Sequence, residues 1–456
     1  KYLQNFITAS ELKAGNREHR EKLRFNIDQY DHSVIKGKMK YKDLELAKKR
    51  AARIKTKAIE NLENHLKDFE VNFTNNGGKI IWAENAQQAI SGILEVLKRA
   101  GAKMVVKGKS MTTEEIGLNK HLETNGIEPV ETDLGEFIVQ LAGEAPYHIV
   151  TPAMHKSKED VARLFNEKKG LPADSTPEEI TRYVRGLLRE KFTKADVGIT
   201  GGNFIIADIV GVAITENEGN ALLSVAFPKI HIAVAGIEKL IPYMKDLDLF
   251  WSLLATHGTG QHITVYNTIL TGPRRENETD GPDEMYVVLL DNGRTNVLAD
   301  PELRQALNCI RCGACLNGCP IYKNIGGHAY GATYSGPIGS IITPHFEGMN
   351  DFMHLSFASS LCGKCTEVCP VKIDLHKLLL HNRNRSVKMN MGSGTEKLSM
   401  FLWKMGMLNR KKMNRISAGI KNVLLKFIYK KSWGNRRELP KIAEKSFNEI
   451  WRKEIQ

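Results

Sequence analysis

The stretch CIRCGACLNGCPIY, Cys309 to Tyr322, holds four of the seven cysteines in the chain. Its spacing is C-x-x-C-x-x-C-x-x-x-C-P, and a second run, SSLCGKCTEVCPVKI at residues 359–373, holds the other three. Residues 1–308 contain no cysteine. Because a disulfide framework would spread its cysteines through the fold, this clustering predicts a domain built around metal-binding thiolates.

The spacing of the first run is typical of ferredoxins with two iron–sulfur clusters. In these proteins, three cysteines of a run bind one cluster, and the fourth, which precedes a proline, binds the other cluster. The predicted ligands are Cys309, Cys312, Cys315 and Cys369 for the first 4Fe-4S cluster, and Cys319, Cys362 and Cys365 for the second. Zinc is the alternative metal, because C-x-x-C pairs also build zinc ribbons, but four cysteines followed by proline favour iron and sulfur.

The second run lacks one cysteine, and Ser359 stands where a complete motif would have it. Several arrangements are open: a 3Fe-4S cluster, or a 4Fe-4S cluster whose fourth iron is bound by Ser359, His354, water, substrate or a partner chain. An iron with an open position could bind substrate as a Lewis acid. The ferredoxin-like surroundings favour an electron-relay cluster with a noncysteine ligand.

Upstream of the cysteines, short apolar strands alternate with amphipathic helices. The predicted strands include residues 79–83, 103–108, 127–133, 147–152, 231–238, 263–270 and 285–291, and the predicted helices include 86–100, 158–169 and 177–194. This alternation predicts an α/β fold with a mainly parallel sheet that is covered by helices on both faces.

The chain of 456 residues is longer than one typical domain. We expect a helical segment at 1–75, an α/β domain at 76–297, a helical ferredoxin-like domain with two clusters at 298–382, and a basic helical region at 383–456. The net charge is +13, and residues 383–438 alone carry fifteen Lys or Arg against two acids, an excess of the same size.

The basic region has three possible roles, and two of them are as a docking surface. A basic amphipathic helix could lie on an anionic membrane surface or dock on an acidic partner such as a quinone-linked acceptor, or it could pack on the cluster domain with a solvated basic face. No recognised nucleic-acid-binding motif accompanies the charge, so nucleic acid is not an expected partner. No apolar run is long enough to span a bilayer, and the first residues lack the pattern of a signal peptide. We expect a cytoplasmic protein, with the inner face of the membrane as the alternative.

Two turns that follow predicted strands carry candidate ligand-binding residues. Lys107 and Lys109, in KGKSM, are suited to an acidic ligand, although solvated lysines are the ordinary case. Gly201, Gly202 and Asn203, in GITGGNF, could present successive backbone N–H groups to an anion. A tight turn without a ligand is the alternative there, and the sequence does not match the dinucleotide-binding fingerprint.

Two further stretches carry side chains suited to acid–base chemistry. Glu216 and Glu218, in TENEGN, follow an apolar strand, where α/β folds usually place their chemistry. His257 and Gln261, in THGTGQH, precede another strand, and His257 or His262 could serve as a base for a hydroxyl proton. A structural role is the alternative for each.

Several stretches together resemble the lactate utilisation protein B family, the iron–sulfur component of a bacterial L-lactate oxidation system. They are residues 105–141, 148–165, 198–220, 231–242 and the two cysteine runs. The resemblance implies an α/β domain like that of the sugar-phosphate isomerase and CoA-transferase superfamily, followed by a two-cluster domain. It also implies that the seven cysteines are the cluster ligands, so that the missing eighth is a family trait.

The resemblance implies an electron carrier that works with the other lactate-utilisation proteins while lactate becomes pyruvate and passes electrons towards an acceptor such as the quinone pool. Two other functions stay open. The chain could itself be the lactate dehydrogenase, with substrate at the incomplete cluster or in the α/β domain. It could instead be a scaffold or nucleic-acid-binding module that the clusters only stabilise.

Overall fold

The computed structural model describes residues 1–392, 394–410, 412, 415–433 and 438–454. The chain forms two compact units, residues 1–385 and 386–456. The expected segments 1–75, 76–297 and 298–382 therefore share one compact unit, and the boundaries between them stay predictions. Of the expected basic region at 383–456, residues 393, 411, 413–414, 434–437 and 455–456 lie outside the described residues.

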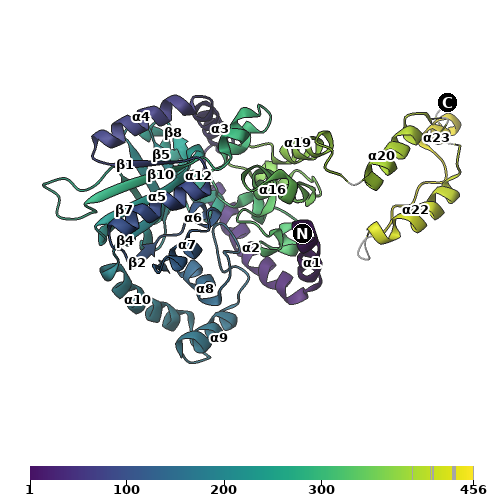
Figure 1. Cartoon of the computed structure of the whole chain (residues 1–456). Helices are drawn as coiled ribbons and strands as arrows, with labels where there is room; N and C mark the ends of the chain where they lie inside the picture. The colour runs from purple at the N-terminus through teal and green to yellow at the C-terminus, as the bar shows by residue number, and fades with distance from the viewer. Residues whose placement is uncertain (393, 411, 413–414, 434–437, 455–456) are drawn as a thin grey trace. The chain divides into compact units, whose positions relative to one another are not determined.

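Four helices precede the first strand: α1 (Tyr2–Gly15), α2 (Arg17–Lys38), α3 (Leu44–Glu60) and α4 (Leu62–Asn75). The side chains of Asn16 and Asp43 cap α2 and α3 by accepting backbone N–H groups of the first turn. In Figure 1 the purple helices α1 and α2 lie beside the green helices of the cysteine-rich part. Leu23, Ile27 and Ala51 are fully buried in the same core as the cysteines. Helices α1, α2 and α3 thus complete the core of the cysteine-rich domain, whereas the buried side chains of α4 belong to another core.

A six-stranded parallel sheet forms the centre of the α/β part (Figure 1). Its order is β1 (Lys79–Ala83), β10 (Glu284–Leu290), β7 (Ile230–Gly236), β4 (Val197–Gly201), β2 (Met104–Lys107) and β3 (Glu128–Glu131). Every neighbouring pair is parallel. The central strands are mainly apolar because both faces of such a sheet are buried. The predicted α/β fold is confirmed.

Helices on the two faces of the sheet occupy separate apolar cores. On one face, α5 (Ala86–Arg99) and α7 (Leu118–Thr124) contribute to a core with Val105, Val234 and Val288. Near the β3 edge, α8 (Leu134–Ala142), α9 (Lys158–Lys169) and α10 (Pro177–Lys194) form another. The start of α10 is set by a capping box between Thr176 and Glu179.

A second sheet covers the other face together with α4. Its order is β8 (Leu240–Ile241), β5 (Phe204–Ile206), β6 (Gly211–Glu216) and β9 (Tyr266–Leu270). Strands β5 and β6 form an antiparallel hairpin, and β6 also pairs antiparallel with β9. Three short elements accompany the sheets: α6 (Met111–Glu115), α11 (Asn220–Ala226) and α12 (Leu247–Thr259). The second sheet carries Glu216 at the end of β6 to the carboxyl edge of the main sheet.

The prediction of a strand at residues 147–152, and with it a strand position for His148, is wrong. This segment is irregular. The carbonyl oxygen of Tyr147 accepts the Tyr322 hydroxyl at 2.9 Å, and the Tyr147 hydroxyl lies 2.6 Å from His19 Nε2. The apolar residues that looked like a strand are buried against the N-terminal helices and the cysteine-rich domain instead of in the sheet.

The cysteine-rich part of the first unit is built from short helices. They are α13 (Arg294–Ala299), α14 (Ala314–Asn317), α15 (Tyr322–Ile325), α16 (Gly336–Phe346), α17 (Met349–Phe352), α18 (Lys364–Val368) and the start of α19 (Leu375–Lys388). The 3-10 turns η1 (Ile237–Lys239) and η3 (Arg304–Asn308) border it. Leu316, Ile341 and Leu379 are fully buried in its core.

The second unit contains α20 (Gly394–Met407), α22 (Ala418–Trp433) and α23 (Phe447–Glu454). Within this unit, Leu398, Phe401, Leu402 and Trp403 on α20 are exposed. No helix among the described residues is both long enough and apolar enough to cross a membrane.

Candidate functional site

Four cysteine side chains line one pocket inside the cysteine-rich domain: Cys309, Cys312, Cys315 and Cys369. Apolar side chains such as Ile149, Ile338 and Ile373 form the rest of its wall. Turn η3 ends directly before Cys309, and the left-handed Gly313 (φ 78°) begins α14, which carries Cys315. Two cysteine runs that lie 40 or more residues apart therefore supply thiols to the same pocket.

Backbone N–H groups point at two sulfurs of this set. The N–H of Arg311 donates to Cys309 Sγ, and the N–H of Ile373 donates to Cys369 Sγ, each at 3.4 Å. Burial, followed by the neighbouring thiols, raises the pKa of Cys312 and Cys315. Burial also raises the pKa of Cys369 to about 11. These thiols are protonated at neutral pH, so a metal that binds them must displace protons.

The remaining three cysteines form a separate group. Burial raises the pKa of Cys319, and the thiol of Cys362 adds to that effect. Burial likewise raises the pKa of Cys365 to about 11, with further contributions from Cys319 and Cys362. Cys362 is exposed, so this group lies nearer the surface than the group of four. This division into four and three cysteines is expected if the last cysteine of each run binds the cluster of the other run.

The two cysteine runs have the same backbone conformation. Arg311 and Leu361 both have positive φ, 62° and 56°, and the glycines two residues further on, Gly313 and Gly363, have φ of 78° and 79°. The N–H of Leu361 donates to Ser359 Oγ at 3.1 Å, as the N–H of Arg311 donates to Cys309 Sγ. The loop thus gives the Ser359 oxygen the local position that the sulfur of Cys309 has in the first run.

His354, the other residue considered for the incomplete set, has apolar neighbours. Its ring lies 5.4 Å from the ring of Phe6 and 6.3 Å from that of Phe352. Its backbone belongs to a 3-10 turn rather than to the repeated loop. The repeated loop therefore singles out Ser359.

A cavity of about 340 Å³ lies where the α/β part meets the cysteine-rich domain. On its α/β side are six of the residues that the sequence predicted to bind a ligand: Lys109, Gly201, Gly202, Asn203, Glu216 and Glu218. On its other side are Arg311, Cys312 and Tyr334. Lys109, Asn203 and Lys239 follow the ends of β2, β4 and β7, so the cavity lies at the carboxyl edge of the parallel sheet, where α/β folds bind ligands.

The glycine-rich turn is required by a close approach of two elements. A Cβ atom on Gly201 would lie 2.6 Å from Ser110 Oγ and 2.9 Å from Ser110 Cβ. Ser110 caps α6 through its own side chain. Glycine at this position lets the end of β4 lie against α6 and leaves the neighbouring cavity open.

The acids of the cavity already accept backbone hydrogen bonds. The carboxylate of Glu216 accepts the N–H groups of Ala221 at 2.7 Å and Leu222 at 2.9 Å. Burial raises the pKa of Glu216 in spite of these donors. Glu218 is exposed and accepts the N–H of Leu134 at 3.4 Å. These contacts hold both carboxylates in place at one side of the cavity.

The positively charged side chains of the cavity have fewer hydrogen-bond partners than its acids. Lys109 Nζ donates to the carbonyl oxygen of Val150 at 2.5 Å. Lys239 is 8% exposed, and its Nζ has no hydrogen-bond or ion-pair partner within the described parts of the chain. Burial and the nearby Arg311 lower the pKa of Lys239 to about 8. Arg311 is 9% exposed, and its Nε and Nη1 are buried without a partner among the described residues.

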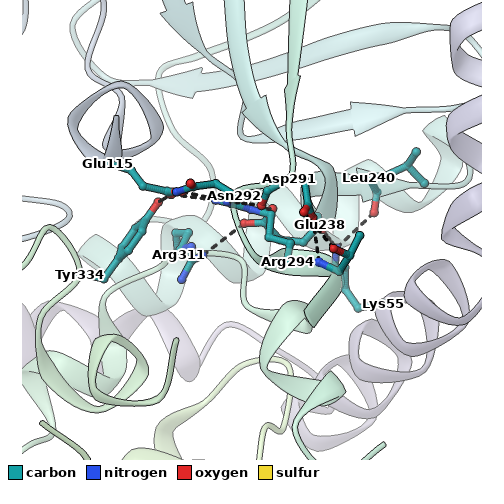
Figure 2. Close-up of polar contacts among 10 residues, drawn as sticks. Lys55, Glu115, Glu238, Leu240, Asp291, Asn292, Arg294, Arg311 and Tyr334 are labelled. Atoms are coloured by element: carbon teal, nitrogen blue, oxygen red, sulfur yellow. Dashed lines mark hydrogen bonds and ion pairs between the residues drawn. The ribbon is translucent and has the colours of Figure 1, made fainter. Parts of the chain in front are cut away.

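A buried ion network holds Arg311 against the end of β7 (Figure 2). Glu238 accepts Arg311 Nη2 at 3.2 Å, and it also accepts the guanidinium of Arg294, which is fully buried. The opposite side of Arg294 binds Glu115, whose carboxylate also accepts the Tyr334 hydroxyl at 2.7 Å. The guanidinium of Arg311 lies over the Tyr334 ring, 4.4 Å from its centroid. Arg294 and Arg311, followed by Lys239, lower the pKa of Glu238 to about 2, although burial alone would raise it.

Three of the predicted ligand-binding residues lie away from the lining of the cavity. Lys107 is fully buried and paired with Glu131 at 2.7 Å and Glu114 at 3.2 Å. His257 Nδ1 contacts the carbonyl oxygen of Leu253 at 2.9 Å, and burial lowers its pKa to about 4. Gln261 pairs its amide with that of Asn217.

Lys239, Arg311 and Tyr334 are lining residues that were not predicted from the sequence. Two of them lie beside predicted features, since Lys239 follows the predicted strand at 231–238 and Arg311 stands inside the first cysteine run. A charged residue directly after a buried strand was the available signal for Lys239. The pairing of Arg311 with Glu238 depends on the packing of two domains, and the sequence offers no sign of it.

Comparison with known proteins identifies both parts of the first unit. Residues 66–290 match the family described as "LUD domain", and residues 305–373 match the "4Fe-4S dicluster domain". The chain is therefore an iron–sulfur protein with a LUD domain, and the dicluster match confirms the two clusters that the cysteine spacing predicted.

Relatives along most of the chain specify the family. "Lactate utilization protein B" of Bacillus cereus (strain AH820) is 42% identical over 88% of this chain and 86% of its own length. "Uncharacterized electron transport protein YkgF" of Escherichia coli (strain K12) is 42% identical over 89% of this chain and 87% of its own length. The chain belongs to the lactate utilization protein B family. A solved DUF162 family protein from Deinococcus radiodurans matches 50% of this chain and 98% of its own chain with a TM-score of 0.29 and 13% identity.

Proposed function

We propose that this protein carries electrons during the oxidation of L-lactate to pyruvate. The observation that supports this most strongly is the gathering of seven thiols into a group of four and a group of three within a dicluster domain. Each 4Fe-4S cluster accepts and releases single electrons at a potential set by its ligands, hydrogen bonds and burial. Oxidation of lactate to pyruvate releases two electrons and two protons, so two clusters can take up the electrons of one turnover.

The ligands proposed for the clusters are those of the crossed arrangement. The first cluster would be held by Cys309, Cys312, Cys315 and Cys369, and the second by Cys319, Cys362, Cys365 and the oxygen of Ser359. The N–H groups of Arg311 and Ile373 donate to sulfurs of the first set, which stabilises the more negative, reduced state. Three of the four thiols of that set, Cys312, Cys315 and Cys369, are buried away from water, whereas the exposed Cys362 gives the second set a path to the surface.

The partners that we propose are the other lactate-utilisation proteins of the cell, because two relatives are named for lactate utilization and for electron transport. The acceptor would be linked to the quinone pool. Exposed apolar residues on α20 stand among lysines, as in a helix that lies on an anionic membrane surface. We therefore propose a cytoplasmic carrier that docks at the inner face of the membrane. Sedimentation of the full chain with anionic and with neutral vesicles tests this docking.

Growth on L-lactate as sole carbon source tests the proposed function. A strain without this gene and without any other lactate oxidase should fail to grow, and the wild-type gene should restore growth. Cys309→Ser should not restore it, although Ser360→Ala, an exposed residue next to Ser359, should. Growth of the deletion strain would remove lactate as the substrate of the pathway.

A second function, that the chain itself oxidises lactate, is favoured by one observation. The cavity at the carboxyl edge of the sheet is lined by Cys312, one of the proposed cluster ligands, so a molecule bound there would lie beside the first cluster. Anaerobic mixing of the purified protein with L-lactate separates the two functions. Reduction of the clusters without any other protein would support the dehydrogenase, and clusters that stay oxidised until the partner proteins are added would support the carrier.

A further inference from the structure

We infer that the cavity between the α/β part and the cysteine-rich domain binds a small 2-hydroxy carboxylate, with its carboxylate on Arg311 and Lys239 and its hydroxyl towards Glu216 and Glu218. The choice of a 2-hydroxy acid rests on the proposed function. The choice of a carboxylate rests on the side chains of the cavity.

Arg311 supplies the first argument. It is more than nine-tenths buried, it lines the cavity, and its Nε and Nη1 lack partners in the described part of the chain. A buried N–H donor without a partner costs free energy, so a native structure normally provides one for it. Tyr334 and Glu238 fix the guanidinium from two sides, so its free donors are preorganised. Guanidinium groups hold carboxylates through paired hydrogen bonds.

Lys239 supplies a second, independent argument. It comes from the end of β7, on the α/β side of the cavity, whereas Arg311 comes from the cysteine-rich domain. Its ammonium has no partner within residues 1–392 or the other described ranges. A carboxylate has room for donors on both oxygens. One carboxylate between Arg311 and Lys239 would therefore satisfy donors from both domains and join them across the cavity.

The acids of the cavity explain why the ligand should carry a hydroxyl group as well. Asp133 accepts the N–H of Glu136 at the start of α8, and Glu216 accepts two N–H groups at the start of α11. These acceptors are engaged, but each carboxylate oxygen can accept a further hydrogen bond. The cavity groups that lack hydrogen-bond partners are thus mainly donors, and they favour an anionic ligand. Glu216 and Glu218 can accept a hydrogen bond from the hydroxyl group of that ligand.

The site is coupled to the first set of cysteines through the backbone. Arg311 stands between Cys309 and Cys312, and its own N–H donates to Cys309 Sγ. A carboxylate that binds the Arg311 side chain places negative charge beside the proposed first cluster. Binding should therefore change the electronic environment of that cluster, which gives a readout that does not depend on turnover.

Calorimetry on the oxidised holoprotein under anaerobic conditions tests the inference directly. L-lactate should bind saturably with one site per chain. Propionate, which lacks the hydroxyl, and lactamide, which lacks the charge, should each bind more weakly, by roughly tenfold or more, because propionate loses the hydrogen bond to the acids and lactamide brings no negative charge to Arg311 and Lys239. Equal binding of all three compounds, or no binding of L-lactate, would overturn the inference.

Lys239→Met removes the ammonium and keeps most of the side-chain volume. It should weaken L-lactate binding by roughly tenfold to a hundredfold, the usual value of a hydrogen bond to a charged group. Lys229→Met is the matched control, because Lys229 is exposed at the opposite, amino end of the same strand. Lys229→Met should bind L-lactate as the wild type does. If Lys239→Met has unchanged iron content and binds L-lactate normally, the cavity is not the binding site.

Electron paramagnetic resonance of the dithionite-reduced protein provides the second readout. L-lactate should alter the signal of one cluster in the wild type and in Lys229→Met, and should leave the signal of Lys239→Met unchanged. If the wild-type protein does not bind L-lactate although its gene restores growth, the inference is contradicted and the electron-transfer function stands. If the wild-type protein binds L-lactate but its gene has no effect on growth, the inference stands and the proposed function is contradicted.

Discussion

The N–H of Leu361 donates to Ser359 Oγ in the second cysteine run as the N–H of Arg311 donates to Cys309 Sγ in the first. This relationship places a hydroxyl where a complete motif would have its first thiol. It is the reason for preferring Ser359 to His354 as the fourth ligand of the second cluster.

Ser359→Ala should convert the second cluster to a three-iron form. Removal of the hydroxyl leaves one iron without a protein ligand, so the iron content should fall by about one atom per chain. Iron analysis and electron paramagnetic resonance of the oxidised protein measure this, because an oxidised 3Fe-4S cluster is paramagnetic and an oxidised 4Fe-4S cluster is not. Ser359→Cys should keep all irons and shift the reduced spectrum. An unchanged spectrum and iron content in Ser359→Ala would show that another group is the ligand, and Ser360→Ala serves as the neutral comparison.

Arg294→Met should destabilise the protein severely. Arg294 is fully buried between Glu115 and Glu238, and its loss leaves two buried carboxylates without their main partner. Breaking a buried ion pair in this way costs about 3–5 kcal/mol. Chemical denaturation of the holoprotein measures the change. Arg99→Met, which removes a half-exposed pair with Glu284, should cost less than about 1 kcal/mol. Equal effects of the two substitutions would contradict the importance of the network.

The stability of the protein should fall as the pH falls below about 6.5, because several buried histidines resist protonation. Burial lowers the pKa of His231, in the central strand β7, to about 3, and its Nε2 lies 2.8 Å from Thr200 Oγ1. The unfolded chain binds this proton near pH 6.5 and the folded chain does not, so acid favours unfolding. Each buried histidine of this kind lowers the free energy of unfolding at pH 5 by about 2 kcal/mol, compared with its value well above pH 6.5.

The substitution His231→Gln isolates this contribution. The variant should lose less stability than the wild type between pH 7 and pH 5, measured by denaturation of both proteins at each pH. Any acid sensitivity of the clusters is common to both proteins and cancels in the difference. The same pH dependence in both would mean that His231 does not resist protonation.

Removal of the clusters should loosen the N-terminal helices more than the α/β part. Leu23 and Ile27 of α2 share one core with Cys312 and Cys315, so the loss of the metal removes contacts on which α2 depends. Hydrogen exchange of the protein before and after anaerobic iron chelation should show faster exchange in α2. Helix α10, which packs in a separate core with Val106, is the internal control. Unchanged exchange in α2 would indicate that the helices fold without the clusters.

Much of the fold could be predicted from local patterns. Strand β1 and helices α9 and α10 have the predicted bounds, because each has a clear apolar period and terminal signals such as Pro177 after Thr176. The segment at 147–152 had the apolar character of a strand but is buried through packing on distant residues. The second sheet was also missed, since pairing between β6 and β9 depends on residues about 50 positions apart. Local sequence does not encode such partners.

The site was predictable to a similar degree. Cysteine spacing carries chemistry directly, and turns after strands indicated Lys109, Gly201, Glu216 and Glu218, all of which line the cavity. Lys107 and His257 looked equivalent in the sequence, but the side chain of Lys107 is turned towards Glu131 and that of His257 towards its own helix. Which neighbour a buried polar side chain meets is decided by tertiary packing.

The burial of α2 and α3 in the cysteine-rich core has a consequence for synthesis of the chain. These helices leave the ribosome before the residues that cover them, such as Leu307 and Leu316, which are made about 250 or more positions later. Their apolar faces therefore stay exposed to solvent while the whole α/β part is translated. The nascent protein should depend on a chaperone during this interval and on a prompt supply of iron and sulfide at its end.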